Sequence, residues 1–524
     1  MKGREKSDGR IVPEGRRKAV QTPGGDQGGG KAVTASEEAR QLELFAEPAD
    51  SPKGDVVRAG EGRPDPVPVA VPMSADNERR ALPAMVMEEV ASSGNLRRAL
   101  RQVVSNKGAP GPDGKSVEWV REHFEKLLPH LQRELLEGSF SPGLIRRVWI
   151  PKPGGGERGL GIPDVIDRIV QQAVHQVLSP HWVPAFHPSS HGFIEGRSCH
   201  TAIEEAIGYL KEGMNIVVDI DLEKFFDRVN HQRLMARLEQ KATDRRLLSL
   251  IWKMLKAGIV MPDGVVVTND EGVPQGGPLS PLLSNIVLDE LDWELDRRGH
   301  RFVRYADDCN IYVGSERAGH RVMTSVTRFI ERRLRLKVNA SKSAVAPPED
   351  RHFVGFRLRK DPMDGTVEVL LSKRSVDRIK AKVHALTPRT WGRSMADCIQ
   401  RINEYVQGWT GFFWIVTDTE QRRLQSLDAH IRRRLRAIQL KHWKRKRTAL
   451  RRLIRMGCRP RTVLKYFYKE GRRSIWALSH CPPVDYALNK RFFKDLGLLS
   501  ISEHRQELCA KRTIAQAQQT LPFG

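Results

Sequence analysis

Short apolar runs alternate with acidic turns in the middle of the chain. The runs Phe302–Val303 and Ile311–Val313 flank the segment Tyr305–Asp308, of sequence Tyr-Ala-Asp-Asp, and predict two strands of a tight hairpin. A β-branched run leading into Asp219 and Asp221 predicts another strand, with both aspartates on one face. The pattern therefore predicts carboxylates at the ends of neighbouring strands.

Two other patterns predict helices. Apolar residues recur at helical spacing between Ile379 and Phe413, and an apolar helix is expected from Ser280 and Pro281, packed under the sheet. Strands in the middle of the chain and helices after residue 355 together predict an α+β fold with an antiparallel sheet.

The charge restricts the partners. The 524 residues carry a net charge of +25 with a pI near 10.0, which implies a polyanionic partner, with a membrane surface as the competing one. No apolar run reaches the roughly 18 residues of a transmembrane helix, and the N-terminus lacks the apolar core of a signal peptide. The six cysteines have no zinc-ligand spacing and suit a reducing cytosol.

Residues 1–82 are rich in glycine, proline, alanine and charge, and predict a disordered tail. Within it, Gln41, Leu42, Leu44 and Phe45 resemble the Gln-Leu-x-Leu-Phe pentapeptide with which bacterial proteins dock on the replicative sliding clamp. Leu44 and Phe45 would then enter an apolar pocket of the clamp. A chance apolar cluster is the alternative interpretation.

The adjacent carboxylates of Asp307 and Asp308 are costly at a turn unless a cation lies between them and a partner. A divalent metal is the natural candidate, because hard cations take oxygen ligands. With Asp221 as the third carboxylate, the set would complete a two-metal site for in-line attack on a phosphate. A solvated turn would be the better interpretation of an isolated pair, but this pair is accompanied by further motifs.

Three motifs resemble those of reverse transcriptases and stand in the same order. Residues 216–227, 272–285 and 305–308 are similar to motifs A, B and C of that family. Glycines in the second motif let the backbone approach a base pair or sugar without interference from a Cβ atom. The resemblance implies a right-hand polymerase with fingers and palm, which copies RNA into DNA from deoxynucleoside triphosphates.

The resemblance also implies roles for single residues. Asp221, Asp307 and Asp308 would be the catalytic groups and would hold two Mg²⁺ ions. Phe226, five residues after Asp221, would be the steric gate that excludes a 2′-hydroxyl. The alternative makes Phe225 and Phe226 core aromatics, and one of the two is expected to be. Nucleotide contacts are implied for Lys152, Arg158, Phe226, Gln275, Gly276 and Lys342.

The glycine-rich stretch 150–163 resembles the fingers hairpin of the same family. Lys152 and Arg158 would clamp a triphosphate there, Arg158 through a bidentate fork. A polar hairpin with ordinary surface charges is the alternative. Two positions depart from the family pattern, Gly159 where proline is usual and Ile194 where arginine is usual. One basic contact to nucleic acid is therefore expected to be missing.

Two further regions resemble group II intron proteins. Residues 106–114 are similar to the glycine-proline loop of their N-terminal extension, which closes over the template strand. Asn403–Trp409, with Phe412 and Phe413, resembles their maturase-specific domain. An ordinary amphipathic core helix would have the same periodicity, so this assignment depends on the resemblance.

The most basic stretch runs from Arg432 to Arg461, with fourteen Lys and Arg residues and no acid. A charge run is usually a solvated face, but this density repels itself unless phosphates neutralise it. Intron RNA and the primer–template backbone are the expected ligands, bound through phosphates without reading sequence. The expected contacts are Arg432, Arg433, Arg434, Arg436, Lys441, Lys444, Arg445, Lys446, Arg447, Arg451 and Arg452.

The last segment resembles the short C-terminal region of bacterial group II intron proteins. It contains no Cys-x-x-Cys pairs and no HNH-like histidine cluster, so the DNA endonuclease domain of many relatives is expected to be absent, as in class C-like members. Such an element must find its primer elsewhere. A DNA 3′ end at a replication fork is one source that a clamp-docking peptide would fit.

The sequence thus predicts a bacterial group II intron-encoded reverse transcriptase and maturase, cytoplasmic and associated with the nucleoid. It would copy intron RNA by target-primed reverse transcription and assist splicing. Two alternatives stay open: a domesticated or defence-associated reverse transcriptase, and an RNA-binding splicing factor without polymerase activity. The expected divisions are a tail at 1–82, N-terminal extension and fingers at 83–170, palm with fingers segments at 171–367, thumb and maturase domain at 368–440, and a basic DNA- and RNA-binding region at 441–524.

Overall fold

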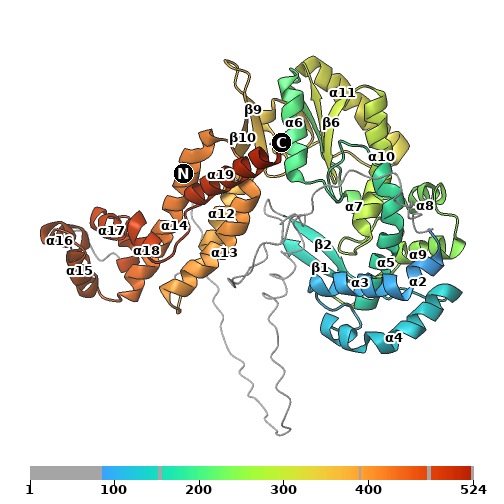
Figure 1. Ribbon diagram of the computed structural model, residues 1–524, viewed down its shortest axis with the longest axis horizontal. Coiled ribbons are helices and arrows are strands. Elements are labelled where there is room, and N and C mark those ends of the chain that lie inside the picture. Colours follow the sequence, from blue (N-terminus) through green and yellow to red (C-terminus); the bar gives the residue numbers. More distant parts are fainter. Residues whose placement is uncertain (1–84, 152–155, 389–390, 469–473, 521–524) are drawn as a thin grey trace, which may run out of the picture.

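The computed structural model describes residues 85–151, 156–388, 391–468 and 474–520 (Figure 1). The predicted tail, the clamp-like pentapeptide Gln41–Phe45 and Lys152 lie outside the described residues.

An antiparallel sheet of four strands forms the frame of the acidic segment. Its strand order is β6-β7-β3-β8, and each neighbouring pair is antiparallel. The hairpin expected around residues 305–308 and the strand expected before Asp221 are both confirmed. The strands are β3 (Ile216–Ile220), β6 (Arg301–Tyr305), β7 (Asp308–Val313) and β8 (Ala344–Ala346).

Apolar side chains alternate across this sheet and bury both of its faces. Val218 and Ile220 of β3 belong to one buried cluster, together with the helices that cover that face. Val217 belongs to a second cluster on the other face, where α6 (Cys199–Lys211) packs. Because side chains alternate along a strand, Asp219 and Asp221 follow Val217 onto the second face. The helices of the first face include α10 (Ser280–Arg297) and α11 (Glu316–Phe329).

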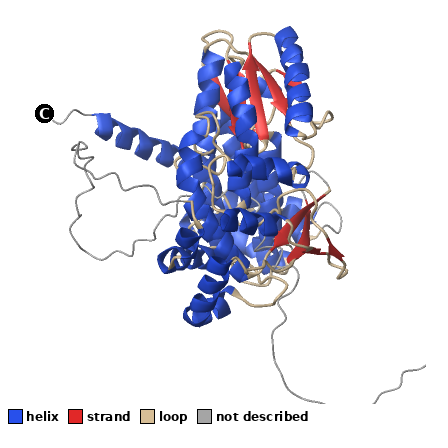
Figure 2. Ribbon diagram, turned by 90° about the vertical axis from the view of Figure 1, so that its right-hand side faces the viewer, coloured by secondary structure: helices blue, strands red, loops and turns tan. Residues whose placement is uncertain are grey.

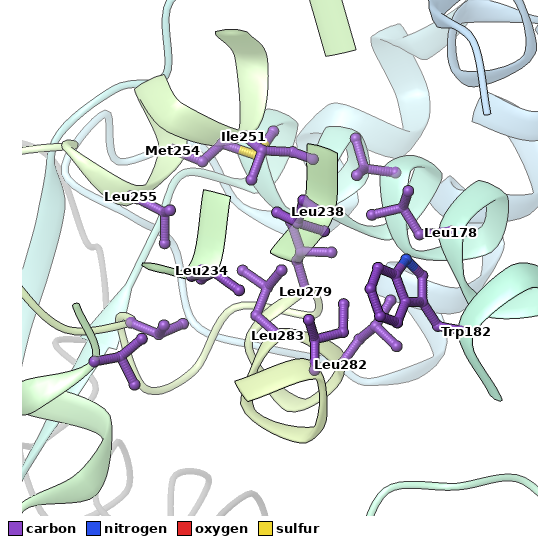
Figure 3. Packing of buried hydrophobic residues seen from close by; sticks show 14 of the residues in the cluster. Leu178, Trp182, Leu234, Leu238, Ile251, Met254, Leu255, Leu279, Leu282 and Leu283 are labelled. Atoms are coloured by element: carbon purple, nitrogen blue, oxygen red, sulfur yellow. The ribbon is translucent and has the colours of Figure 1, made fainter. Parts of the chain in front are cut away.

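The first cluster extends into the N-terminal helices (Figure 3). Leu178 and Trp182 lie there beside Leu238 and Leu282, which belong to the same cluster. The predicted apolar helix after Ser280 is therefore confirmed as a core helix. The helices of this part are α2 (Met87–Ala91), α3 (Ser93–Ser105), α4 (Val117–Glu137), α5 (Val165–Trp182), α7 (Phe225–Arg228), α8 (His231–Glu239) and α9 (Arg245–Leu255).

A second sheet stands apart from the first, as the two groups of red strands in Figure 2 show. Its order is β2-β1-β4-β5, and the glycine-rich hairpin expected at 150–163 is its β1–β2 pair. The loop 106–114 packs beside it, because Arg146 of β1 donates to the Pro110 carbonyl and Arg168 donates to the Ala109 carbonyl. The strands are β1 (Ile145–Pro151), β2 (Glu157–Ile162), β4 (Ile259–Val260) and β5 (Val266–Val267).

The helical pattern between residues 379 and 413 is confirmed as two helices. They follow a small hairpin, β9 (Phe356–Lys360) and β10 (Val367–Leu371), and share the second buried cluster with later helices. The helices are α12 (Lys373–Leu386), α13 (Met395–Phe413), α14 (Gln421–His442), α15 (Lys446–Arg455), α16 (Pro460–Tyr468), α17 (Pro482–Ala487), α18 (Lys490–Asp495) and α19 (Ile501–Thr520).

Three of the expected division points fall inside these elements. The one after residue 170 lies within α5, the one after 367 within β10, and the one after 440 within α14. All six cysteines are free thiols. Among the described residues, no helix is both long enough and apolar enough to span a bilayer.

Two glycines lie on helices that cover opposite faces of the main sheet. We expect substitution by a larger residue to destabilise the protein at one of them and to have little effect at the other. A Cβ atom at Gly319 of α11 would run into the Val345 side chain and lie 3.5 Å from the side chains of Ile216 and Val218. At Gly208 of α6, no atom lies within 4 Å of the same position. Gly319→Val should therefore lower the free energy of unfolding by about 1–3 kcal/mol through overpacking. Gly208→Val is the matched control and should change it by less than about 0.5 kcal/mol. Urea unfolding measures both, and equal effects would contradict the packing described.

Candidate active site

The acidic turn has a tightly constrained backbone. Tyr305 and Asp308 are the last paired residues of β6 and β7, so Ala306 and Asp307 form a two-residue loop. Ala306 has φ of +54°, in the left-handed region that L-residues seldom adopt. Gly192 lies directly against this loop: a Cβ atom there would be 2.9 Å from the Ala306 Cα and 3.1 Å from the Tyr305 carbonyl carbon. The turn therefore fits only against a residue without a side chain.

A buried arginine lies next to the turn and holds it. Arg304, on β6, is fully buried, and its guanidinium pairs with the carboxylate of Asp292 on α10 at 2.5 Å and 2.7 Å. It also donates to the carbonyl oxygen of Ala306 at 2.8 Å. Two further bonds reach the Asn285 Oδ1 at 3.0 Å and the Ser190 Oγ at 2.6 Å. All five N–H donors of the guanidinium are therefore used. Burial alone would lower the pKa of Arg304, but the Asp292 carboxylate raises it overall.

Asp221 lies one step beyond the last paired residue of β3. Ile220 pairs with Cys309, so the next position places Asp221 across from Asp308. Its backbone is held by the segment 339–343: the Asp221 amide donates to the Ser343 Oγ at 3.0 Å, and the Asn339 amide donates to the Asp221 carbonyl at 2.8 Å. Lys342 of this segment brings its Nζ to 3.5 Å from the Asp221 carboxylate.

Asp219 has a different partner, which separates the two aspartates of this strand. Arg351 donates to its carboxylate from Nε at 2.9 Å and from Nη2 at 2.5 Å. The same guanidinium donates to the Lys342 carbonyl at 2.7 Å. Asp219 thus anchors the segment that carries Lys342, whereas Asp221 faces the ammonium group of Lys342.

The carboxylates of the turn repel one another. Burial first, and then the negative charges of Asp307, Asp219 and Asp221, raise the pKa of Asp308 to about 7, even though its side chain reaches solvent. Burial also raises the pKa of Asp307; the Asp221 charge adds to this effect, and Arg158 opposes it. The structure thus brings Asp221, Asp307 and Asp308 within electrostatic range of one another. Ionisation of Asp307 and Asp308 is therefore unfavourable without a nearby cation.

The chemistry of these three carboxylates suits a divalent metal. Their oxygens are the hard ligands that Mg²⁺ takes, and the raised pKa values show a local excess of negative charge that a cation would relieve. Within the described residues, no three His, Cys, Asp or Glu side chains are arranged closely enough to hold an ion as they stand. The donor set therefore fits the metal in chemistry, and the side chains would have to close around it.

The predicted nucleotide contacts Arg158 and Gln275 touch each other. Arg158 of β2 donates from Nε to the Gln275 Oε1 at 2.8 Å, and the Gly161 amide donates to the Gln275 carbonyl at 2.7 Å. Gly276 has φ of +123°, and a Cβ atom there would collide with the Gly161 carbonyl. The glycines of the second motif therefore let the loop dock on the β1–β2 hairpin. Sequence reasoning gave them a different role, that of admitting a base pair or sugar.

Phe225 and Phe226 are both buried in the first cluster, although only one of them was expected to be a core residue. Their rings meet edge to face with centroids 5.1 Å apart. The Phe226 carbonyl accepts a bond from the Val273 amide at 2.6 Å. Gly272, with φ of +95°, passes so close that a Cβ atom would be 2.8 Å from the same carbonyl oxygen. The second motif thus contacts the strand-to-helix segment after Asp221 as well as the hairpin.

Most of the eleven predicted nucleic-acid contacts lie on an exposed basic surface around α15. Arg434, Arg436 and Lys446 bond within the protein instead, Lys446 to the Phe467 carbonyl at 3.0 Å. Arg434 donates to the Thr387 side chain and carbonyl, and Arg436 bonds the Leu488 carbonyl and pairs with Asp485. The exposed members are Arg433, Lys441, Lys444, Arg445, Arg447, Arg451 and Arg452. Arg432 and Lys446 are half-buried.

Sequence reasoning did not find three residues that shape the site. Arg304 was passed over, although a charged residue inside an otherwise apolar strand pattern is a usable signal. Gly192 was not predicted as a contact of the turn. Arg351 was missed because nothing local shows that it pairs with Asp219, which lies 132 positions away. Ile194, the departure from the family's arginine, is a buried core residue.

Comparison with known families defines the class of this site. Residues 150–358, which contain the main sheet, the acidic turn and the second sheet from the end of β1 onward, match the family described as reverse transcriptase (RNA-dependent DNA polymerase). Residues 376–456, from α12 into the turn after α15, match the group II intron maturase-specific domain. The fold is therefore that of a reverse transcriptase followed by a maturase domain.

Individual relatives agree with this class. The chain is 34% identical to Protein YkfC of Escherichia coli over 317 residues, which cover 52% of this chain and 83% of that protein. It is 36% identical to the group II intron-encoded protein LtrA of Lactococcus lactis subsp. cremoris over 198 residues, 37% of this chain and 32% of that protein. It is 30% identical to the putative COX1/OXI3 intron 1 protein of Saccharomyces cerevisiae over 292 residues, 54% of this chain and 34% of that protein.

The chain therefore belongs to the group II intron reverse transcriptase and maturase family. It covers most of the Escherichia coli relative and about a third of the two intron proteins.

Because the carboxylates are crowded, we expect Asp308 to destabilise the protein when no metal is bound. Because the folded-state pKa of Asp308 is raised, its ionisation costs folding free energy, and stability should fall as the pH rises from about 4 to about 7. Asp308→Asn removes that charge and should raise the melting temperature in EDTA at about pH 8. Millimolar Mg²⁺ should then stabilise the unsubstituted protein more than the variant.

Thermal melts with and without Mg²⁺ measure both effects. Asp495→Asn, an exposed aspartate at the end of α18, is the control and should change neither melting temperature. If Asp308→Asn melts lower than the unsubstituted protein in EDTA, the repulsion described above is refuted.

Proposed function

We propose that this protein copies the RNA of a group II intron into DNA by target-primed reverse transcription, and that Asp221, Asp307 and Asp308 carry the catalysis. The observation that supports this most directly is the meeting of the three carboxylates at the end of the main sheet, with Arg158 close enough to act on Asp307. In this proposal the main sheet is the palm, the β1–β2 hairpin belongs to the fingers, and α12 with α13 forms the thumb.

The three aspartates would hold two Mg²⁺ ions. When bound, the ions would activate the primer 3′-hydroxyl and neutralise the triphosphate. Arg158 would bind the triphosphate through its guanidinium, with Lys152, six positions earlier in the sequence, as a second cation. Gln275 and Gly276 would contact the nucleotide region, and Phe226 would exclude a 2′-hydroxyl by contact.

Lys342 is the proton donor that the geometry favours. Its Nζ already lies 3.5 Å from the Asp221 carboxylate, and Arg351 fixes the backbone of its segment. A lysine held there would release the proton that the leaving pyrophosphate takes up. A group positioned for general acid catalysis typically contributes about 10²- to 10⁴-fold in rate.

The exposed basic surface around α15 would bind the folded intron RNA and the primer–template backbone. Exposed arginines and lysines neutralise phosphates and release counterions, which gives affinity without sequence readout. The protein would assist splicing in this way, while the RNA performs the splicing chemistry. A function on intron RNA and chromosomal target DNA places the protein in the bacterial cytoplasm, at the nucleoid. The pentapeptide at 41–45 is proposed to dock on the sliding clamp.

Primer extension on an RNA template tests the polymerase. Asp307→Ala removes one of the three proposed metal ligands and should abolish Mg²⁺-dependent extension, a fall of at least about 10³-fold. Asp495→Ala is the control and should extend primers at the unsubstituted rate. Extension by Asp307→Ala at more than about a tenth of that rate would refute the assignment.

Intron splicing tests the basic surface. The triple variant Arg447→Gln, Arg451→Gln, Arg452→Gln should bind intron RNA less tightly and reduce the salt dependence of log K by about 2 to 3. The control removes three exposed charges around α11, at the other end of the molecule (Figure 1). The residues are Arg317, Arg321 and Arg332. Protein-assisted splicing at limiting protein should slow only in the first variant. Equal losses of RNA binding and splicing in both variants would show that the total charge matters and its position around α15 does not.

A further inference from the structure

We propose that Arg304 is a positioning residue of the polymerase site, which orients Asp307 through the carbonyl oxygen of Ala306. The proposal rests on the proposed function, in which Asp307 is a catalytic carboxylate. All five guanidinium donors of Arg304 are taken by protein groups, so it would act without touching substrate or metal.

The bond to Ala306 constrains the peptide group that carries Asp307. The carbonyl of Ala306 and the amide nitrogen of Asp307 share one planar unit, so a donor fixed 2.8 Å from the carbonyl oxygen fixes the plane from which the Asp307 side chain starts. Ala306 holds φ of +54°, a conformation that is unfavourable for an L-residue. Such a conformation persists where surrounding contacts over-determine it, and here the contacts are Arg304 and Gly192.

Arg304 ties the turn to two rigid neighbours. Its ion pair and its bond to Asn285 connect it to α10, and its bond to Ser190 connects it to the segment before Gly192. Asn285 closes the ring, because its amide donates to the Gly192 carbonyl at 2.8 Å. The backbone of Arg304 joins the same segment, donating to the Ser189 carbonyl at 2.9 Å and accepting from the His191 amide at 2.8 Å. The turn is thus held from both sides by one hydrogen-bonded unit.

A purely structural role would not require this residue. Well-packed apolar residues often replace a buried ion pair with no loss of stability. The guanidinium is distinctive in its planar fork of five donors, which serves Asp292, Asn285, Ser190 and Ala306 at once. A lysine would keep the charge for Asp292 but has a single nitrogen and cannot span the four partners. Arg304→Lys therefore separates the charge pair from the hold on the turn.

Steady-state primer extension is the first test. Arg304→Lys should lower kcat by about ten- to a hundredfold, while the KM for deoxynucleotides and the affinity for primer–template stay within about twofold. Arg301→Lys is the matched control: the same substitution on the same strand, at an arginine whose pair with Glu212 is exposed. It should leave kcat unchanged. A kcat for Arg304→Lys within about twofold of the control overturns the proposal, as does a loss confined to KM.

A double variant distinguishes positioning from stability. Arg304→Met with Asp292→Leu replaces the buried charges by apolar groups and leaves the Ala306 carbonyl without its donor. If the double variant regains the melting temperature but not kcat, the proposal is supported. If kcat returns together with stability, Arg304 is structural and the proposal fails. This pair also takes the place of Arg304→Lys if that variant melts below the assay temperature.

Hydrogen exchange tests the inference without activity. The peptide that contains residues 305–308 should exchange faster in Arg304→Lys than in Arg301→Lys, while peptides from α6 and α11 exchange equally in both. Unchanged exchange at the turn overturns the positioning role. If no variant and not even the unsubstituted protein extends a primer, the proposed function fails, and the exchange experiment still decides whether Arg304 holds the turn.

Discussion

The ion pair between Arg304 and Asp292 is the constraint on which the active-site frame depends. Both side chains are fully buried, where an unpaired charge would cost several kcal/mol, so the two must stay together whenever the protein is folded. Arg304 comes from the strand that enters the acidic turn, and Asp292 from the helix that carries the end of the second motif. The pairing therefore fixes motif B against motif C. Because the remaining donors reach Ser190, Asn285 and Ala306, the loop before α6 is fixed in the same unit.

This rigidity is needed because the crowded carboxylates of the site lower the stability of the folded protein. Burial first, and then the negative charges of Asp307, Asp219 and Asp221, raise the pKa of Asp308, and separation of the carboxylates would relieve the repulsion among them. Two cations at the edges of the site offset part of this charge: Arg351 pairs with Asp219, and Lys342 lies near Asp221. Asp307 and Asp308, at the hairpin, have no such direct ion pair among the described residues. The unbalanced charge is thus concentrated where the proposed metals would enter, and the frame stores the repulsion that metal binding would relieve.

Local patterns predicted what is local. The hairpin around residues 305–308, the strand before Asp221 and the helix after Ser280 follow from local patterns, and all were confirmed. The glycine-rich β1–β2 hairpin was expected from its resemblance to a fingers hairpin, and a hairpin is present there. Pairings between distant segments could not be read in this way. Arg304 meets Ser190 across 114 positions and Arg158 meets Gln275 across 117, and no one-dimensional pattern marks either pair. Charge density was also an incomplete guide, because Arg434 and Arg436 sit in a basic run yet bond to the protein's own carbonyls.

These contacts show how the second motif connects separate parts of the structure. Its first residues bond the backbone at Phe226 and Val229, its middle bonds β2 through Gln275, and its helix carries Asn285 and Asp292 to the turn. One continuous segment of about twenty residues thus touches the proposed sugar contact, the proposed triphosphate contact and the acidic turn. Gln275 accepts a bond from the Arg158 Nε, so a triphosphate bound by that guanidinium would lie next to this segment. The nucleotide site and the acidic turn are therefore linked through covalent chain, and glycines at 272 and 276 are required because the segment passes closer to its neighbours than any side chain allows.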